Sequence, residues 1–269
     1  MPNTVYDNFF LANEVEDQFN SHLDLMQFCT VDNTLEGVAG MKKVINVYSA
    51  TNGTEKLTIG QGNSKSIEVG HTSKEYEILL AQNRFDYYDE EEMKDPMTVP
   101  VGMKHAGTDM FNTVNDDIFA AFKSATLSVP DLTAFNFDAF VDGQALLNVE
   151  DVEGLNSFAF CCNEDMASIR KTLKDSLQYV ESFARRGYVG TVGGTNLYVK
   201  KNATPGEIIL STKEAVTCFV KKGVEVEQVT KNVRSEEAAN KRLNSIFTRK
   251  YYVCALTDAT KAVKLTLAA

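Results

Sequence analysis

The sequence lacks any long apolar segment. No stretch approaches the roughly 20 consecutive apolar residues that a membrane-spanning helix needs, although 43% of the 269 residues are hydrophobic. The first thirty residues contain neither Lys nor Arg and no apolar block, so a secretory signal peptide is not expected there. With 24% charged residues, the composition is that of a globular protein with a sizeable core and no membrane partner.

The spacing of a metal site is missing as well. The five cysteines, an odd number, form no C-x-x-C pair, and the three histidines lie far apart. Cys161 and Cys162 are adjacent in the apolar run SFAFCC, so we interpret the cysteines as small core residues in a reducing compartment. The acidic run DYYDEEEMKDP (86–96) lacks the ligand spacing of a calcium loop. We interpret it as a solvated or inter-subunit face, with a cation site as the alternative, and expect no cofactor.

Catalytic motifs are also missing. There is no G-x-S-x-G and no H-E-x-x-H, and the acidic pairs occur in runs, with no sign of an opposed acid and base. The glycine-rich stretch RRGYVGTVGGTNLYVKK (185–201) follows a predicted helix and leads into a strand. Phosphate-binding loops have the reverse order, since the phosphate lies at a helix N-terminus. We therefore interpret Gly187 as a helix end and Gly193–Gly194 as a turn, and we do not expect an enzyme.

Charge is distributed unevenly along the chain. Residues 1–169 carry 9 basic and 28 acidic residues, a net charge of −19, and residues 170–269 carry 18 and 9, a net charge of +9, which together give −10. One interpretation is that the acidic and basic residues are separated along the sequence by chance and become mixed on the surface when the chain folds. The other is that the acidic half contacts the basic half of a neighbouring copy, which would steer association. The acidic total argues against strong DNA binding.

Hydrophobic periodicity in the first hundred residues predicts an arm and a hairpin. Residues 1–40 have only short helical spacing in a polar, acidic context. Alternation in KKVINVYSA, and again in SIEVGHTSKEYEILLAQNRFDYY, flanks a segment rich in Gly, Asn and Thr, which predicts a long hairpin. Leu57 and Ile59 lie at its tip, where only solvent would surround them on a lone molecule, so we expect a partner to cover them.

Two helices dominate the remaining pattern, and the whole predicts the α+β class. Apolar residues at spacings of three and four predict a long helix from Pro96 towards Ala125. A second helix is predicted from a cap at Asn163 to Arg185 and Arg186. The other predictions are a short helix in FDAFVDGQALL, a buried strand in LNSFAFCC, a short polar helix after residue 233, turns at 205–206 and Asp258, and strands between them that include 251–256.

Six stretches, taken in order, carry a resemblance to a known family. They are VYDNFFLANEVEDQFN, AGMKKVINVYSATNGTEKL, KEYEILLAQNRFDYYDEEEMKDPM, GYVGTVGGTNLYVKK, STKEAVTCFVKKGVEVEQV and RKYYVCALTD. In this order they resemble the major capsid protein of tailed bacteriophages, of the Hong Kong 97 type and similar to phages of Firmicutes-type bacteria. The resemblance spans nearly the whole chain; its motifs are weak one by one and fairly specific together.

The resemblance implies a Hong Kong 97-type capsid fold with five parts. Residues 1–40 would be the N-terminal arm, and residues 41–85 the region of the extended E-loop hairpin. Residues 86–130 would hold the spine helix of the peripheral (P) domain, and residues 131–245 the axial (A) domain. Residues 246–269 would be C-terminal strands that return to the P domain.

The implied function is assembly. Copies of the chain would form the pentamers and hexamers of an icosahedral shell that encloses the double-stranded DNA of a tailed phage, without sequence-specific contacts. The shell would assemble in the bacterial host cytoplasm, with a separate scaffolding protein, a portal and a decoration protein as further partners. The candidate subunit-contact residues are Phe9 and Phe10 in the arm, Lys56, Leu57, Ile59 and Lys65 at the hairpin tip, Asp89, Glu90 and Glu91 in the acidic run, and Arg185 and Arg186.

Several alternatives stay open from the sequence. An encapsulin-type compartment would share the fold, but its usual interior helix at the start differs from this acidic, extended arm. A tail or other virion structural protein would form rings or tubes, and an enzyme would use the glycine stretch or the acidic run. Some relatives have a removable N-terminal scaffolding segment, and Met1 favours a separate scaffold or none. Some relatives crosslink an E-loop Lys to an Asn, and Lys56 and Lys65 lie in that region without a clear partner.

Overall fold

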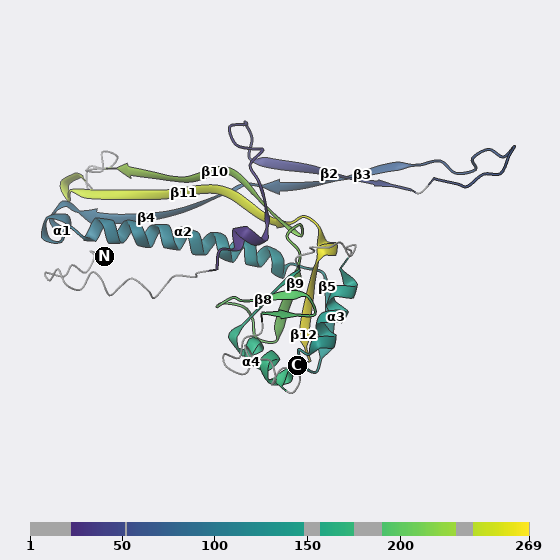
Figure 1. Cartoon of the computed structure of the whole chain (residues 1–269). Helices are drawn as coiled ribbons and strands as arrows, with labels where there is room; N and C mark the ends of the chain where they lie inside the picture. The colour runs from purple at the N-terminus through teal and green to yellow at the C-terminus, as the bar shows by residue number, and fades with distance from the viewer. Residues whose placement is uncertain (1–22, 52, 148–156, 175–189, 230–238, 269) are drawn as a thin grey trace.

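The computed structural model has three parts: an elongated part along a long helix, a smaller part at one end of it, and a hairpin that projects away (Figure 1). The structure describes residues 23–51, 53–147, 157–174, 190–229 and 239–268. The predicted α+β class is confirmed.

The elongated part is a four-stranded sheet with helix α2 (Thr98–Lys123) along it (Figure 1). The strand order is β1-β10-β11-β4; β1 is parallel to β10, and the other neighbours are antiparallel. Met110, Val114, Ile118 and Phe122 of α2 are buried, as their spacing predicts. The strands and the short helices of this part are η2 (Leu25–Phe28), β1 (Thr30–Asp32), β4 (Leu79–Tyr88), α1 (Asp89–Lys94), β10 (Val216–Val229) and β11 (Leu243–Leu256).

The smaller part is a six-stranded sheet with two helices. Its strand order is β5-β12-β9-β6-β8-β7. The strands are β5 (Leu127–Leu132), β6 (Phe158–Cys161), β7 (Thr191–Val192), β8 (Thr195–Val199), β9 (Glu207–Ser211) and β12 (Ala262–Leu267). The helices are α3 (Phe137–Leu146) and α4 (Asn163–Thr172), and the 3-10 helix η4 (Ala259–Lys261) precedes β12. Gly193 and Gly194, with φ of 54° and 82°, make the predicted turn between β7 and β8.

Strand β6 joins the cores of the two parts. Alternate residues of a strand face opposite sides of its sheet. Phe158 and Phe160 belong to the core beneath α2, whereas Ala159 and Cys161 belong to the core of the smaller part. The Phe158 ring packs edge-on against Phe122 of α2, with 5.7 Å between centroids. The predicted buried strand is thus confirmed, and it explains why all four residues are apolar.

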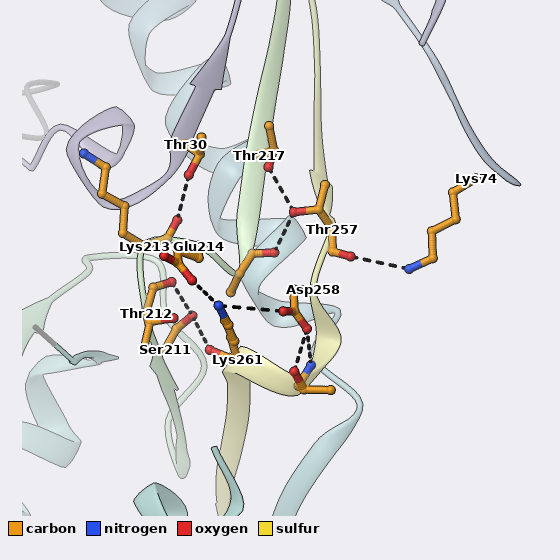
Figure 2. A network of polar contacts seen from close by, with 12 residues as sticks. Thr30, Lys74, Ser211, Thr212, Lys213, Glu214, Thr217, Thr257, Asp258 and Lys261 are labelled. Atoms are coloured by element: carbon orange, nitrogen blue, oxygen red, sulfur yellow. Dashed lines mark hydrogen bonds and ion pairs between the residues drawn. The ribbon is translucent and has the colours of Figure 1, made fainter. Parts of the chain in front are cut away.

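Two of the connections between the two sheets lie at the junction in Figure 2. Residues 212–215 connect β9 to β10, and residues 257–261 connect β11 to β12. Lys261 forms ion pairs with Glu214 and, at 4.0 Å, with Asp258. The Thr212 N–H donates to the Lys261 carbonyl oxygen at 3.2 Å, so the two connections are bonded directly to each other.

Two further contacts fix α2 to the strands beside it. The Lys200 ammonium, whose residue is only 3% exposed, pairs with Asp116 of α2 at 2.7 Å. The Tyr252 hydroxyl of β11 donates to Asp117 Oδ2 at 2.5 Å. Two adjacent carboxylates of α2 thus attach this helix to the rest of the protein: Asp116 to the smaller part and Asp117 to the long sheet.

Some sequence predictions differ from the structure. The side chain that accepts at the start of α4 is that of Cys162, whose Sγ takes the Asp165 N–H at 3.3 Å, so the predicted cap at Asn163 is wrong. Helix α4 ends at Thr172, and residues 175–186 of the predicted helix lie outside the described residues. Strand β11 has 14 residues, where alternation alone predicted only 251–256.

The sheets also cut across the expected segment boundaries. Strand β10 falls within residues 131–245 but pairs with β11 of the long sheet. Strand β12 falls within residues 246–269 but pairs with β5 and β9 of the smaller part. Strand partners are chosen by contacts between residues far apart in sequence, which local patterns do not reveal.

Candidate subunit-contact surfaces

The predicted hairpin is confirmed over β2 and β3, which form a two-stranded sheet of their own, whereas residues 79–88 of its expected second strand form β4 of the long sheet. Strand β2 (Lys42–Ala50) pairs antiparallel with β3 (Val69–Glu77) in an unbroken register from Lys42↔Glu77 to Ala50↔Val69. Figure 1 shows it extending beyond the rest of the molecule. Its base is held by the Ile78 N–H, which donates to the Met41 carbonyl oxygen at 2.7 Å.

The tip of the hairpin, residues 51–68, has its own polar contacts. The Thr51 N–H donates to the Glu68 carbonyl oxygen at 3.0 Å, and the Glu68 N–H donates to Thr51 Oγ1 at 2.9 Å. Further out, Glu55 accepts from the Ser64 N–H at 2.8 Å and from the Ser64 hydroxyl at 2.6 Å. These bonds lower the pKa of the Glu55 carboxyl. The described residues of the tip are therefore bonded to one another across the two sides of the loop.

Apolar side chains are exposed along this hairpin. Ile59 is fully exposed at the tip, and Leu57 is 44% exposed. Ile67, Val69, Tyr48 and Val44 are all at least 49% exposed as well. An isolated two-stranded hairpin is at best marginally stable in water, and exposed apolar patches of this kind mark interaction sites. The hairpin is therefore the strongest candidate contact surface in the described part of the chain.

The two faces of the hairpin differ near its base. Tyr76 stacks on Phe219 of β10, with 5.2 Å between ring centroids, and so fixes one face against the long sheet. Lys43 is the cross-strand partner of Tyr76, so these two side chains lie on the same face. Successive side chains of a strand alternate between faces, so Val44 and Tyr48, at odd spacing from Lys43, lie on the opposite face. Tyr48 lies beside His71 across the strands, with 6.0 Å between ring centroids, and is 68% exposed. Alternation had located these residues in a strand, but it gave no signal for which face would be exposed.

The acidic helix α1 follows the far end of β4. Asp89 accepts from Asn244 Nδ2 at 2.6 Å, and Glu91 accepts from the Tyr88 N–H at 3.2 Å. Glu90 is exposed and pairs with Arg242 at 3.8 Å. All three carboxylates predicted as contact residues thus have partners within the chain, Asp89 and Glu91 through hydrogen bonds and Glu90 through an exposed ion pair.

Asp86, just before this helix, has a perturbed pKa. Its burial alone would raise that pKa, but hydrogen bonds from Arg84 Nε at 2.7 Å and the Ser245 hydroxyl at 2.6 Å outweigh burial and lower it. The carboxylate form of Asp86 is therefore favoured by the folded state.

The visible start of the arm is fixed to α2 by one buried residue. Asn115, which is 1% exposed, accepts from the Leu25 N–H through Oδ1 at 3.0 Å. Its Nδ2 donates to the Leu23 carbonyl oxygen, also at 3.0 Å. The sequence did not single out Asn115, because a polar residue on an apolar helix face gives no sign of its partner.

The predicted contact residues do not converge on one site. Figure 1 places α1 and the hairpin tip at opposite ends of the molecule. Lys56 and Lys65 are exposed at the tip, beside Leu57 and Ile59. Phe9, Phe10, Arg185 and Arg186 lie outside the described residues. Among the described residues no group of acidic, His or Cys side chains could hold a metal ion, and no described helix is long and apolar enough to span a membrane.

Similarity to known proteins is found in the three-dimensional structure and not in the sequence. No protein-family model matches the sequence, and no curated protein matches it. The structure is similar to a chain of Mycobacterium phage Che8, with a TM-score of 0.70 over 98% of this chain and 96% of that one, at 13% identity. It also matches the capsid of the cyanophage P-SCSP1u, with a TM-score of 0.70 over 96% and 91% of the two chains, at 11% identity.

A third match is the mature capsid of bacteriophage PhiM1, with a TM-score of 0.68 over 99% of this chain and 92% of that one, at 10% identity. The chain has the Hong Kong 97-type fold. Because these matches cover more than nine-tenths of both chains, the likeness extends over the hairpin, the long helix and the smaller sheet together.

Proposed function

We propose that this chain is the major capsid protein of a tailed phage, which forms the pentamers and hexamers of an icosahedral shell around double-stranded DNA. The observation that carries the proposal is the structural likeness, over nearly the full length, to chains from phage particles. The exposed apolar hairpin supports it independently, because such a surface fits a protein that works in contact with other copies. The role is structural, with no enzymatic activity, and its place is the virion capsid after assembly in the host cytoplasm.

The parts of the chain take roles in the shell that follow the sheets. The hairpin β2–β3 is the E-loop. Helix α2 and the four-stranded sheet form the P domain, and the six-stranded sheet with α3 and α4 forms the A domain. This assignment moves β10 to the P domain and β12 to the A domain; the pairing of β10 with β11, and of β12 with β5 and β9, supports it.

In this proposal the hairpin tip lies on a neighbouring subunit and buries Leu57 and Ile59. Full burial of a fully exposed side chain of this kind contributes about 1.5–3 kcal/mol. Leu57 is already more than half buried, so the two together contribute roughly 2–4 kcal/mol to each contact. A closed shell repeats the contact once for every subunit, and repeated linked contacts give a stability that no single contact provides. Lys56 and Lys65 form the charged rim of the tip contact.

The remaining candidates would serve other contacts. Phe9 and Phe10 would bind a neighbour through the arm, and the exposed Glu90 would meet a basic segment such as Arg185–Arg186 of another copy. A separate scaffolding protein, a portal and a decoration protein are the further partners that we propose, and the packaged DNA would make no sequence-specific contacts.

The test is electron microscopy and size-exclusion chromatography of the purified chain, with and without two tip substitutions. The unchanged protein should give closed shells or curved sheets, and Leu57→Asp with Ile59→Asp should abolish them. Gln61→Asp is the matched control: it adds a negative charge at an exposed position of the same tip but removes no apolar surface, so assembly should persist.

Three results would count against these proposals. Normal shells from the Leu57→Asp, Ile59→Asp variant would refute the role of the tip. A monomer that persists even when the neighbouring genes are co-expressed would refute the capsid assignment. Rings or tubes would indicate a tail or other virion structural protein. The encapsulin alternative is not favoured, because the similar structures described above come from phage particles.

A further inference from the structure

Two cysteines that are far apart in sequence lie opposite each other in the long sheet. Cys218 of β10 and Cys254 of β11 are direct cross-strand partners in the antiparallel register. Their Sγ atoms are 3.1 Å apart although 36 positions separate them in the chain. Directly opposed residues in antiparallel strands have Cα atoms about 4.5–5.5 Å apart, and disulfides accept Cα separations of about 4.4–6.8 Å. The pairing of the two strands at this point therefore allows the Cα separation that a disulfide needs.

The pair is also reachable from solvent through one of its members. Cys218 is fully buried, but Cys254 is half-buried. Cys254 lines an open groove of about 710 Å³ between α2 and the ends of β4 and β11, together with Leu80, Ala120 and Leu256. A small reagent in this groove would meet Cys254 first and find Cys218 directly behind it.

The other three cysteines lack this arrangement. Cys29, Cys161 and Cys162 are buried. Their thiols point at oxygen atoms: Cys29 at the Met26 carbonyl at 3.6 Å, Cys161 at the Tyr198 carbonyl at 3.6 Å, and Cys162 at Asp165 Oδ2 at 3.1 Å. They fit the interpretation of all five cysteines as inert core residues, and the pair in β10 and β11 departs from it.

The hydrogen bond between the two thiols makes them unequal. The Cys254 S–H donates to Cys218 Sγ, and this bond, opposed by burial and helped by the nearby Lys250 ammonium, lowers the pKa of the Cys218 thiol. The same bond, together with burial, raises the pKa of the Cys254 thiol. The thiolate is the reactive form of cysteine, so Cys254 gives up its proton as it attacks.

We propose that Cys218 and Cys254 form an oxidisable pair, which a low-molecular-weight disulfide such as oxidised glutathione converts into a cross-strand disulfide. Cys254 Sγ attacks one sulfur of the reagent; its S–S bond breaks, and one glutathione leaves as a thiol with the proton of Cys254. Cys218 Sγ then attacks Cys254 Sγ and displaces the second glutathione, which takes the proton of Cys218. Two cysteine thiols are oxidised by two electrons, and one glutathione disulfide is reduced to two thiols.

The two forms of the pair would belong to different surroundings. Thiols persist in the reducing cytosol, and disulfides persist outside the cell. The pair would therefore stay reduced where the chain is made and would link β10 to β11 after exposure to an oxidising medium. The inference concerns the folded chain itself and does not rest on the proposed function.

The test is a thiol count on the purified, unassembled protein. It is reduced, freed of reductant, and treated with oxidised glutathione and, separately, with the smaller bis(2-hydroxyethyl) disulfide. After unfolding, the five titratable thiols should fall to three, and mass spectrometry should identify one peptide pair, joined between Cys218 and Cys254. Cys254→Ser should keep all four of its thiols, and the control Cys29→Ser should fall from four to two.

Five thiols remaining after both reagents would overturn the proposal, and so would a disulfide between any other two cysteines. A stable mixed disulfide at Cys254 would overturn it too, since it would show that Cys218 cannot reach its partner. Because the count is made before assembly, a failure of the capsid assignment would leave it unchanged, and the two failures can be told apart.

Discussion

Replacing two glycines of α2 by alanine should change the stability of the protein in opposite directions. Gly102 and Gly107 both lie within this helix. Alanine is favoured over glycine in a helix interior by about 1 kcal/mol. If the helix alone decided the outcome, both substitutions would stabilise the fold equally.

Packing against β4 makes the effect on stability different at Gly102. A Cβ there would lie 2.7 Å from Phe85 Cε2 and closer still to two other atoms of the same ring. The ring would have to move, and Phe85 also stacks on Tyr87, with 5.9 Å between centroids. Overpacking of this kind costs about 1–3 kcal/mol. After subtraction of the helix gain, Gly102→Ala should destabilise the protein by about 0–2 kcal/mol.

Gly107 has nothing within 4 Å of the added Cβ. Gly107→Ala should therefore keep the full gain and stabilise the protein by about 0.5–1 kcal/mol. Urea unfolding of the unassembled variants, followed by circular dichroism, should rank Gly107→Ala above the unchanged protein and Gly102→Ala at or below it. Equal stabilisation by both substitutions would refute the close packing of Phe85 on α2.

Three further predictions concern polar contacts. Asn115→Ala should lower the free energy of unfolding by about 1–3 kcal/mol, since two buried backbone groups of the arm lose their partner, and earlier proteolysis of the arm should report it. Asp116→Ala should be more destabilising than Lys200→Met in urea unfolding, because the first leaves a buried ammonium unpaired and the second leaves a carboxylate whose side chain is 53% exposed. Asp86 has a lowered pKa in the folded state, so its contribution to stability is present above the ordinary carboxyl pKa of about 4 and is lost as the pH falls through the lowered value. In urea unfolding measured from pH 7 to 3, the free energy of unfolding of the Asp86→Asn variant should fall less with decreasing pH than that of the unchanged protein.

Each of these has a clear contrary result. An unchanged arm in the Asn115→Ala protein would mean that the arm is held elsewhere. Equal losses for Asp116→Ala and Lys200→Met would mean that the ammonium is hydrated in the folded protein. The same pH dependence of the free energy of unfolding with and without Asp86→Asn would mean that another carboxyl dominates acid unfolding.

Local patterns in the sequence predicted the elements best where one period runs unbroken. The long helix around α2 follows from apolar spacings of three and four, and the hairpin follows from alternation on both sides of a glycine-rich tip. Strand β11 was predicted at less than half its length, because residues 243–250 mix polar and apolar side chains. The cap of α4 was assigned to Asn163, since Asn is a common cap, but the Cys162 thiol accepts the bond.

The candidate site was predictable only in part, for a different reason. Leu57 and Ile59 were correctly placed at an exposed tip, because a hairpin fixes its own tip locally. The contacts of Asn115 with the arm, and the approach of Cys218 to Cys254, depend on registers between distant segments. A one-residue slip in such a register turns every side chain to the other face, and the sequence alone does not determine it.

The position of β12 has a consequence for synthesis of the chain. This strand is the last one described, yet it lies inside the six-stranded sheet, between β5 and β9. A ribosome releases the N-terminal residues first, so β5 and β9 emerge and must wait until residues 262–267 have left the exit tunnel. The smaller part therefore cannot close before these residues are made, and a chain that terminates ahead of them lacks a central strand. Only a polypeptide that includes residues 262–267 can present a complete surface to its neighbours.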